Sequence, residues 1–330
     1  MRSTENVGRM SQHFLLSPAA RSLSLAKVAR MSEEEAYEAF RQIRWASTNG
    51  DPVCPKCGCL AVYKYETRKL WKCKACSHQF SVTSGTIFAS RKLPPRDYLM
   101  AIAIFVNGAK GHAALQLSRD LDVQYKTAFV LSHKLREAVA AEQKTLTMNG
   151  EVEVDGAYFG GHVRPANQKE ARVDRRLAEN QTGKRRVVVI MRERNGRTLP
   201  FVFKSEDAAL GTIFARVDQD ATVYADEAAH WDMLHARYLT KRINHSEAYA
   251  DGKTSTNQAE SFFSRMRRAE IGTHHKIAGP YLSAYASEMA WREDNRRVSN
   301  GEQYLMTASA ALTHPVSRQW KGYWQRAKTI

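Results

Sequence analysis

Residues 150–159, with the sequence GEVEVDGAYF, begin the pattern that indicates the fold class of this chain. Apolar and polar side chains alternate along this run with the period of two that is typical of a β-strand. Strand-like and helix-like runs then alternate toward the C-terminus, which indicates an α/β domain. The runs are RRVVVIMRER (185–194), TLPFVFK (198–204), the helix-like EDAALGTIFARV (206–217), ATVYAD (221–226), YLTKRIN (238–244) and a helix over 256–268.

Three acidic residues in this pattern are candidates for a metal-binding site. Asp155 ends the first strand-like run, Asp226 ends the run 221–226, and Glu260 lies in the final helix. Three strands in meander followed by alternating helices and strands is the order of a ribonuclease-H-like fold, in which such acids converge. We expect Asp155 and Asp226 to share one Mg²⁺ or Mn²⁺, and Asp155 and Glu260 to hold a second. Two such ions stabilise an in-line phosphoryl displacement.

Each acid also has a structural alternative. Asp155 precedes a glycine, as turn residues do, and Asp226 suits the cap of a following helix. Glu260 stands three residues after Asn257, which is typical of a capping box. The joint order of the three acids favours the metal site. The acids that compete with them for it are Glu153, which shares a strand face with Asp155, and Glu227, Glu247 and Asp251.

Basic residues accompany the acids. Arg267 follows Glu260 by seven residues, two helical turns on and on the same face. It either pairs with a DNA phosphate beside the cut or is a solvated helix end that the helix dipole favours. The basic run 169–186 either folds onto backbone phosphates or stays a solvated loop.

Four cysteines form two C-x2-C pairs separated by fifteen residues. The gap is long enough for a short β-hairpin, AVYKYETRKLWKC, that would bring the two pairs together. Four thiolates satisfy tetrahedral Zn²⁺ in a structural site, so the spacing predicts a zinc ribbon. Two disulfides are the alternative, which a cytosolic location disfavours. The predicted ligands are Cys54, Cys57, Cys73 and Cys76, and Cys59 is either a spare thiol or an alternative ligand.

The stretch between the cysteines and residue 150 has helical periodicity. A helix begins after Pro94, a second covers HAALQLSRDL (112–121) and a third covers QYKTAFVLSHKLREAVAA (124–141). Two helices joined by a tight turn after a leading helix form the layout of a helix-turn-helix. Its reading helix would present Lys126 and Thr127 to a DNA major groove. A plain three-helix linker is the alternative.

Charge favours a polyanionic partner. The chain has 50 Lys and Arg against 34 Asp and Glu, a formal net charge of +16. A field of this sign makes nucleic acid the default partner. The longest apolar run, MAIAIFVNGA (100–109), is too short to cross a bilayer. We therefore expect no membrane partner and a cytoplasmic protein that binds nucleic acid; the family resemblance described next implies that it acts on bacterial DNA.

The combined motifs resemble a known family. CPKCGCLAVYKYETRKLWKCKACSHQFSVTSGTIF (54–88), VEVDGAYFGG (152–161), VYADE (223–227) and TNQAESFFSRMRR (256–268) are similar to those of bacterial insertion-sequence transposases of the ISXO-like, DDE type. The likeness runs from about residue 31 to residue 297. It implies catalytic roles for Asp155, Asp226 and Glu260 and a basic partner in Arg267. It also implies cleavage at terminal inverted repeats and joining to target DNA, by a homo-oligomer on DNA.

We therefore expect a DNA transposase. The rival functions are a non-catalytic DNA-binding regulator and a ribonuclease-H-like nuclease without joining activity. The expected segments are an N-terminal helical region (1–48), the zinc ribbon (49–90), the helix-turn-helix-like segment (91–146), a ribonuclease-H-like DDE catalytic domain (147–297) and a C-terminal tail (298–330).

Overall fold

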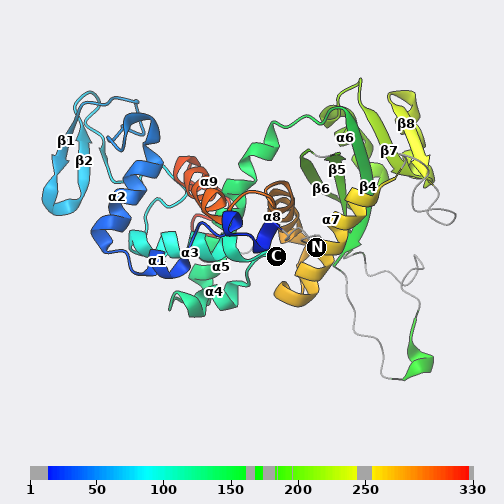
Figure 1. Cartoon of the computed structure of the whole chain (residues 1–330), viewed down its shortest axis with the longest axis horizontal. Helices are drawn as coiled ribbons and strands as arrows, with labels where there is room; N and C mark the ends of the chain where they lie inside the picture. The colour runs from blue at the N-terminus through cyan, green and yellow to red at the C-terminus, as the bar shows by residue number, and fades with distance from the viewer. Residues whose placement is uncertain are drawn as a thin grey trace, which may run out of the picture.

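The computed structural model describes residues 14–160, 168–173, 183, 185–194, 196–243 and 255–326. Figure 1 shows two lobes with the helix α8 between them. The first lobe is helical and carries a small sheet at its far end, whereas the second is built on a larger sheet. No helix in the described ranges is both long enough and apolar enough to cross a membrane.

The small sheet is the predicted hairpin with one strand added. β1 (Val62–Tyr65) pairs antiparallel with β2 (Leu70–Cys73), which pairs antiparallel with β3 (Gln79–Phe80). Beside it, α2 (Glu33–Arg44) begins with a capping box between Ser32 and Glu35, in agreement with the acidic first turn of its sequence.

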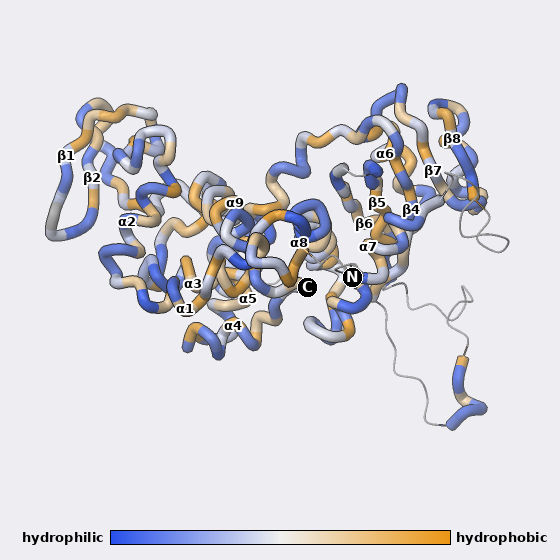
Figure 2. Tube along the Cα trace, in the orientation of Figure 1, coloured by the Kyte–Doolittle hydropathy of each residue, from blue (hydrophilic) through white to orange (hydrophobic). Residues whose placement is uncertain are grey.

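The helices of the first lobe share one hydrophobic cluster with the small sheet. α3 (Pro95–Asn107), α4 (Ala114–Asp120) and α5 (Tyr125–Val139) follow the predicted order of three helices. The cluster also includes α1 (Leu25–Ala29) and α9 (Asn300–Thr313), from opposite ends of the chain. Apolar residues gather along α3 and α5 (Figure 2). Part of the predicted C-terminal tail is therefore core of the first lobe. The buried members of this hydrophobic cluster include Val28, Phe40, Trp71, Leu99, Leu135, Tyr304 and Leu312.

The large sheet has the strand order β6-β5-β4-β7-β8. β4 pairs antiparallel with β5 and parallel with β7, and β7 pairs parallel with β8. The predicted meander and the later alternation of strands with helical segments are both present. One prediction was wrong, because Asp155 lies inside β4 rather than at its end. The strands are β4 (Glu151–Phe159), β5 (Arg186–Glu193), β6 (Thr198–Phe203), β7 (Thr222–Asp226) and β8 (Leu239–Ile243).

Helical segments cover both faces of this sheet. Val152 and Val154 pack with α6 (Leu210–Arg216) and the 3-10 helix η9 (Ala229–Ala236). Ala157 and Phe159 pack with α7 (Asn257–Ala269) and α8 (Leu282–Asp294) on the other face. Alternate residues of a strand share a face, so Glu153 and Asp155 point to the side of α7.

A buried cluster of charges joins the two lobes. The carboxylate of Glu288, on α8, accepts hydrogen bonds from Arg136 of α5 (2.6 Å) and from Arg292. Arg292 also donates to the carbonyl of Phe105 in α3, at 2.6 Å. Burial alone would raise the pKa of Glu288, but the two arginines hold it at about 2. α8 is thus fixed to the first lobe through a carboxylate that stays ionised.

We predict that Glu288→Ala destabilises the protein by about 3–5 kcal/mol, because it leaves two buried guanidinium groups without their counter-charge. Urea unfolding measures the loss. Glu38→Ala is the control, since Glu38 forms an exposed pair with Arg41 of a kind that contributes at most about 1 kcal/mol. Equal losses in the two variants would contradict the role given to Glu288.

Candidate active site and metal centre

The four paired cysteines converge at the base of the small sheet. Their Sγ atoms all lie within 4.8 Å of one another. Cys54 and Cys76 are 3.6 Å apart, and Cys57 lies 3.5 Å from Cys73. A tetrahedron with Zn–S bonds of about 2.3 Å has edges of about 3.8 Å. The four thiols therefore fit a structural zinc ion with little change of side-chain position.

The fifth cysteine is outside this group. The Sγ of Cys59 lies 3.7 Å from the carbonyl oxygen of Ala61 and is not part of the four-sulfur cluster. Within the cluster, the backbone N–H of Cys76 lowers the pKa of Cys73 to about 6. A thiol with a low pKa is readily ionised, as a zinc ligand must be.

Parallel pairing of β4 with β7 brings the two aspartates together. Glu153 pairs with Tyr224 at the last paired position of the two strands, and Asp155 and Asp226 each follow two residues later. Adjacent strands in a sheet lie about 4.8 Å apart, and both aspartates point to the face that α7 covers. Glu260, in the first turn of α7, approaches from above that face.

Electrostatic contact among the acids centres on Asp155. Burial raises the pKa of Asp155 to about 7. The negative charges of Asp226, Glu260 and Glu206 act in the same direction, whereas the N–H of Gly156 opposes them. Asp155 is thus the carboxylate that interacts with both other predicted catalytic acids. Such a group lowers its energy by binding a cation.

The acids form a looser group than the cysteines. Among the described residues, only the four cysteines have ligand atoms that all lie within 4.8 Å of one another. No group of three or more acids in the described part of the chain meets this distance. Of the competing acids, Glu227 is exposed, and Glu247 and Asp251 lie outside the described residues.

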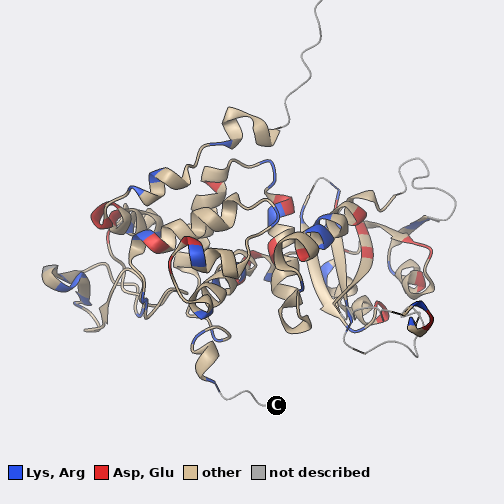
Figure 3. Cartoon of the chain, turned by 90° about the horizontal axis from the view of Figure 1, so that it is seen from below, with Lys and Arg blue, Asp and Glu red and all other residues tan. Residues whose placement is uncertain are grey.

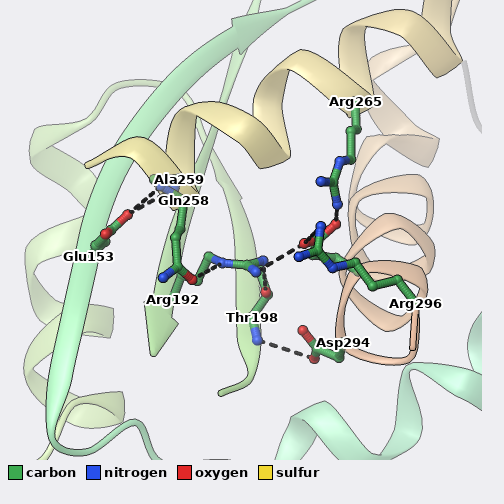
Figure 4. Close-up of polar contacts among 9 residues, drawn as sticks. Glu153, Arg192, Thr198, Gln258, Ala259, Arg265, Asp294 and Arg296 are labelled. Carbon is green, nitrogen blue, oxygen red and sulfur yellow. Dashed lines mark hydrogen bonds and ion pairs between the residues drawn. The ribbon is translucent and has the colours of Figure 1, made fainter. Parts of the chain in front are cut away.

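Glu153 has a structural role that excludes it from the metal site. Its carboxylate is 1% exposed and accepts hydrogen bonds from the backbone N–H groups of Gln258 (2.9 Å) and Ala259 (3.0 Å), as Figure 4 shows. It therefore caps α7 from a neighbouring strand. The predicted capping box between Glu260 and Asn257 is absent, because the N-cap residue is Thr256 and its side chain makes no capping hydrogen bond.

A fourth acid beside the site was missed from the sequence. Glu206 follows β6, and its Oε2 lies 3.1 Å from Nε2 of His230. A Cβ on Gly156 would come within 2.5 Å of Oε1 of Glu206. Glu206 therefore lies directly beside Gly156. Asp155 and Gly156 are both inside β4, so the turn interpretation of this pair was wrong. An acid just after a strand was the only sequence signal for Glu206.

The predicted DNA-binding residues lie on two separate helices. Arg267 is exposed on α7, with its guanidinium 5.9 Å from the centre of the Phe159 ring of β4. Lys126 is exposed and Thr127 half-buried in the first turn of α5. The ammonium of Lys126 lies 5.6 Å from the centre of the Trp324 ring. Most of the basic run 169–186 lies outside the described residues.

Comparison with known proteins agrees with this architecture. Residues 147–294 match the model of the ISXO2-like transposase domain. Residues 31–79 match the model of the transposase zinc-ribbon domain. The first match spans the large sheet with α7 and α8, and the second spans α2 and the four cysteines. Together they define the class as a transposase with an N-terminal zinc ribbon.

A relative from an archaeon matches both lobes at once. It is an uncharacterized protein in transposable element ISH50 of Halobacterium salinarum, 25% identical over 295 residues, which are 86% of this chain and 98% of the relative. No solved structure matches the chain. The chain belongs to the ISXO-like insertion-sequence transposases.

We predict that the protein purified without chelator contains one zinc ion per chain, measured by elemental analysis. Cys54→Ser should abolish zinc binding and unfold the ribbon, because metal binding supplies folding free energy to so small a unit. Cys59→Ser is the matched control and should retain the zinc. A zinc-free parent protein would refute the site.

We predict that Asp155→Asn stabilises the metal-free protein at pH 8. The pKa of Asp155 is raised in the folded state, so the unfolded chain releases this proton more easily and stability is lost as the pH rises from about 4 to about 7. The gain should be on the order of 2–4 kcal/mol and should shrink below pH 5. Thermal unfolding without added divalent cations measures it. A variant less stable than the parent at pH 8 would contradict the electrostatic account.

Proposed function

We propose that this protein is a DNA transposase that binds insertion-sequence ends, cleaves them and joins them to target DNA. The observation that carries the proposal is the parallel pairing of β4 with β7, the strands that bear Asp155 and Asp226, in a sheet covered by the helix that bears Glu260. Membership of the transposase family supports the same assignment. The domain that carries these acids is proposed to be ribonuclease-H-like, on the order of its strands and helices.

Each acid has a separate role in this proposal. Asp155 and Asp226 would hold one Mg²⁺ or Mn²⁺, and Asp155 and Glu260 a second. Bound there, the ions would activate water for cleavage and then a DNA 3′-hydroxyl for joining. No protein nucleophile is needed, since positioning and charge supply the catalysis. The exposed Arg267 would neutralise a DNA phosphate beside the cut.

DNA is the proposed partner of both lobes. The net charge is +16, and Lys and Arg residues are spread over both lobes (Figure 3). α4 and α5 with the zinc ribbon would recognise the element ends, with Lys126 and Thr127 facing the major groove. Trp324 contacts Lys126 in this structure, because its indole N–H donates to the Lys126 carbonyl at 3.2 Å. A homo-oligomer would assemble on the paired ends.

Two rival functions use parts of the same structure. A DNA-binding regulator would need only the ribbon and the helices of the first lobe, and the aligned carboxylates would serve no purpose. A nuclease would need only the second lobe and would cut without joining. The presence of both lobes, in a chain of the transposase family, favours the transposase.

We predict that Asp155→Asn, Asp226→Asn and Glu260→Gln each reduce Mg²⁺-dependent cleavage of element-end DNA by at least about 1000-fold and leave DNA binding intact. Each change removes a charge that a metal ion requires but keeps the size of the side chain. Labelled element-end DNA with and without target DNA separates cleavage from joining, and a gel-shift assay measures binding.

Glu227→Gln is the matched control, because Glu227 follows Asp226 directly and is exposed. It should cleave as the parent does. A parent protein that binds element ends but never cuts them with Mg²⁺ or Mn²⁺ would support the regulator. Cutting without joining would support the nuclease.

A further inference from the structure

The three predicted catalytic acids lie on three separate segments of the chain. Arg194 contacts each of these segments, although not the acids themselves. The guanidinium of Arg194, just after β5, donates from Nε to Glu153 of β4 at 3.0 Å. It donates again to the carbonyl of Ser255, just before α7, at 2.8 Å. The carbon of the same guanidinium lies 3.7 Å from the centre of the Tyr224 ring of β7.

The residues that Arg194 contacts are close in sequence to the predicted catalytic acids. Glu153 precedes Asp155 by two residues, and Tyr224 precedes Asp226 by two residues. Residues two apart on a strand point to the same face, so the contacts of Arg194 lie on the face that carries the aspartates. Ser255 enters the helix whose first turn bears Glu260.

Glu153 extends the arrangement into α7. One of its oxygens receives the Arg194 bond and the other receives the two backbone N–H groups at the start of α7 (Figure 4). A carboxylate at this place also interacts favourably with the helix dipole. The Glu153 side chain is 1% exposed and that of Arg194 is 13% exposed. Both groups are therefore held in a single geometry by burial and by hydrogen bonds.

A planar guanidinium is suited to this task. It hydrogen-bonds through its edge while an aromatic ring packs on its face, and a lysine ammonium cannot do both in a fixed plane. Arg194 satisfies the buried Glu153 and the carbonyl of Ser255 at once, and its contact with Tyr224 adds a cation–π interaction. A movement of β4, β7 or α7 relative to the others would break at least one of these contacts.

We propose that Arg194 and Glu153 form a positioning clamp that sets the distances among Asp155, Asp226 and Glu260, and hence the affinity of this site for divalent cations. The inference rests on the proposed function, since it concerns the same acids. Arg194 and Glu153 do not touch substrate or metal in this proposal. They act only through the segments they hold. If Arg194 and Glu153 only stabilised the fold, their loss would lower stability without a specific effect on the affinity for divalent cations. The experiment must distinguish these two roles.

Arg216 offers a matched control for Arg194. It also donates to two backbone carbonyls, those of Leu146 and Gln143, each at 2.7 Å. It also packs near an aromatic ring, 5.7 Å from the centre of Phe201. These contacts lie away from the segments that carry the acids. Arg216→Met therefore controls for the loss of carbonyl hydrogen bonds and of an aromatic contact, although it leaves no buried carboxylate without its partner.

The test measures Mn²⁺ binding to the full-length protein by electron paramagnetic resonance, with Asp155→Asn as the baseline for other sites. Loss of a group that orients metal ligands typically costs about 10- to 100-fold in affinity. We expect Arg194→Met and Glu153→Gln to weaken Mn²⁺ binding by that factor, and Arg194→Lys by less. Arg216→Met should stay within about 2-fold of the parent in Mn²⁺ affinity.

Hydrogen exchange provides a second measurement that needs no metal. Amides of Gln258 and Ala259 should exchange faster in Glu153→Gln and Arg194→Met than in the parent, with α8 unchanged. Parent-like Mn²⁺ affinity in both variants would overturn the proposal. So would an equal loss of Mn²⁺ affinity in Arg216→Met. A parent that binds no Mn²⁺ above the Asp155→Asn baseline would instead refute the catalytic metal site. Hydrogen exchange would then still decide whether the clamp fixes α7.

Discussion

Burial of carboxyl groups close to one another is the constraint on which the second lobe depends. Asp155 and Asp226 lie on neighbouring strands, and burial raises the pKa of Asp155, with smaller contributions from Asp226, Glu260 and Glu206. Holding these carboxyl groups together in a partly buried place costs free energy that other contacts must offset. The backbone pairing of β4 with β7 and the packing of α7 and α8 on the sheet supply those contacts.

The acids of the described residues differ in whether they are paired with arginines. Glu288 is paired with two arginines, and Glu293 is paired with Arg192, Arg265 and Arg296. Both are structural, because they hold helices in place. Within the described part of the chain, by contrast, no lysine or arginine forms an ion pair with Asp155 or Asp226. The proposed cation site would use the two aspartates that lack such a partner.

Local patterns predicted much of this structure, and long-range contacts limited the rest. The alternation in residues 150–159 and the spacing of the cysteines each depend on neighbours in sequence, and each predicted the observed element. Glu153 could not be assigned in this way, because its partners lie more than a hundred residues away. Glu206 and the return of α9 to the first lobe are also set by tertiary packing, which periodicity does not report.

The position of α9 has a consequence for how the chain folds during synthesis. Its buried residues, such as Tyr304 and Leu312, share a hydrophobic cluster with Val28 and Phe40 near the start of the chain. An N-terminal domain usually folds before the rest of a chain leaves the ribosome. Here the first lobe cannot complete its core until residues 300–313 have emerged. A copy of the gene shortened at its 3′ end would therefore lose the stability of the zinc-ribbon lobe as well as its last helix.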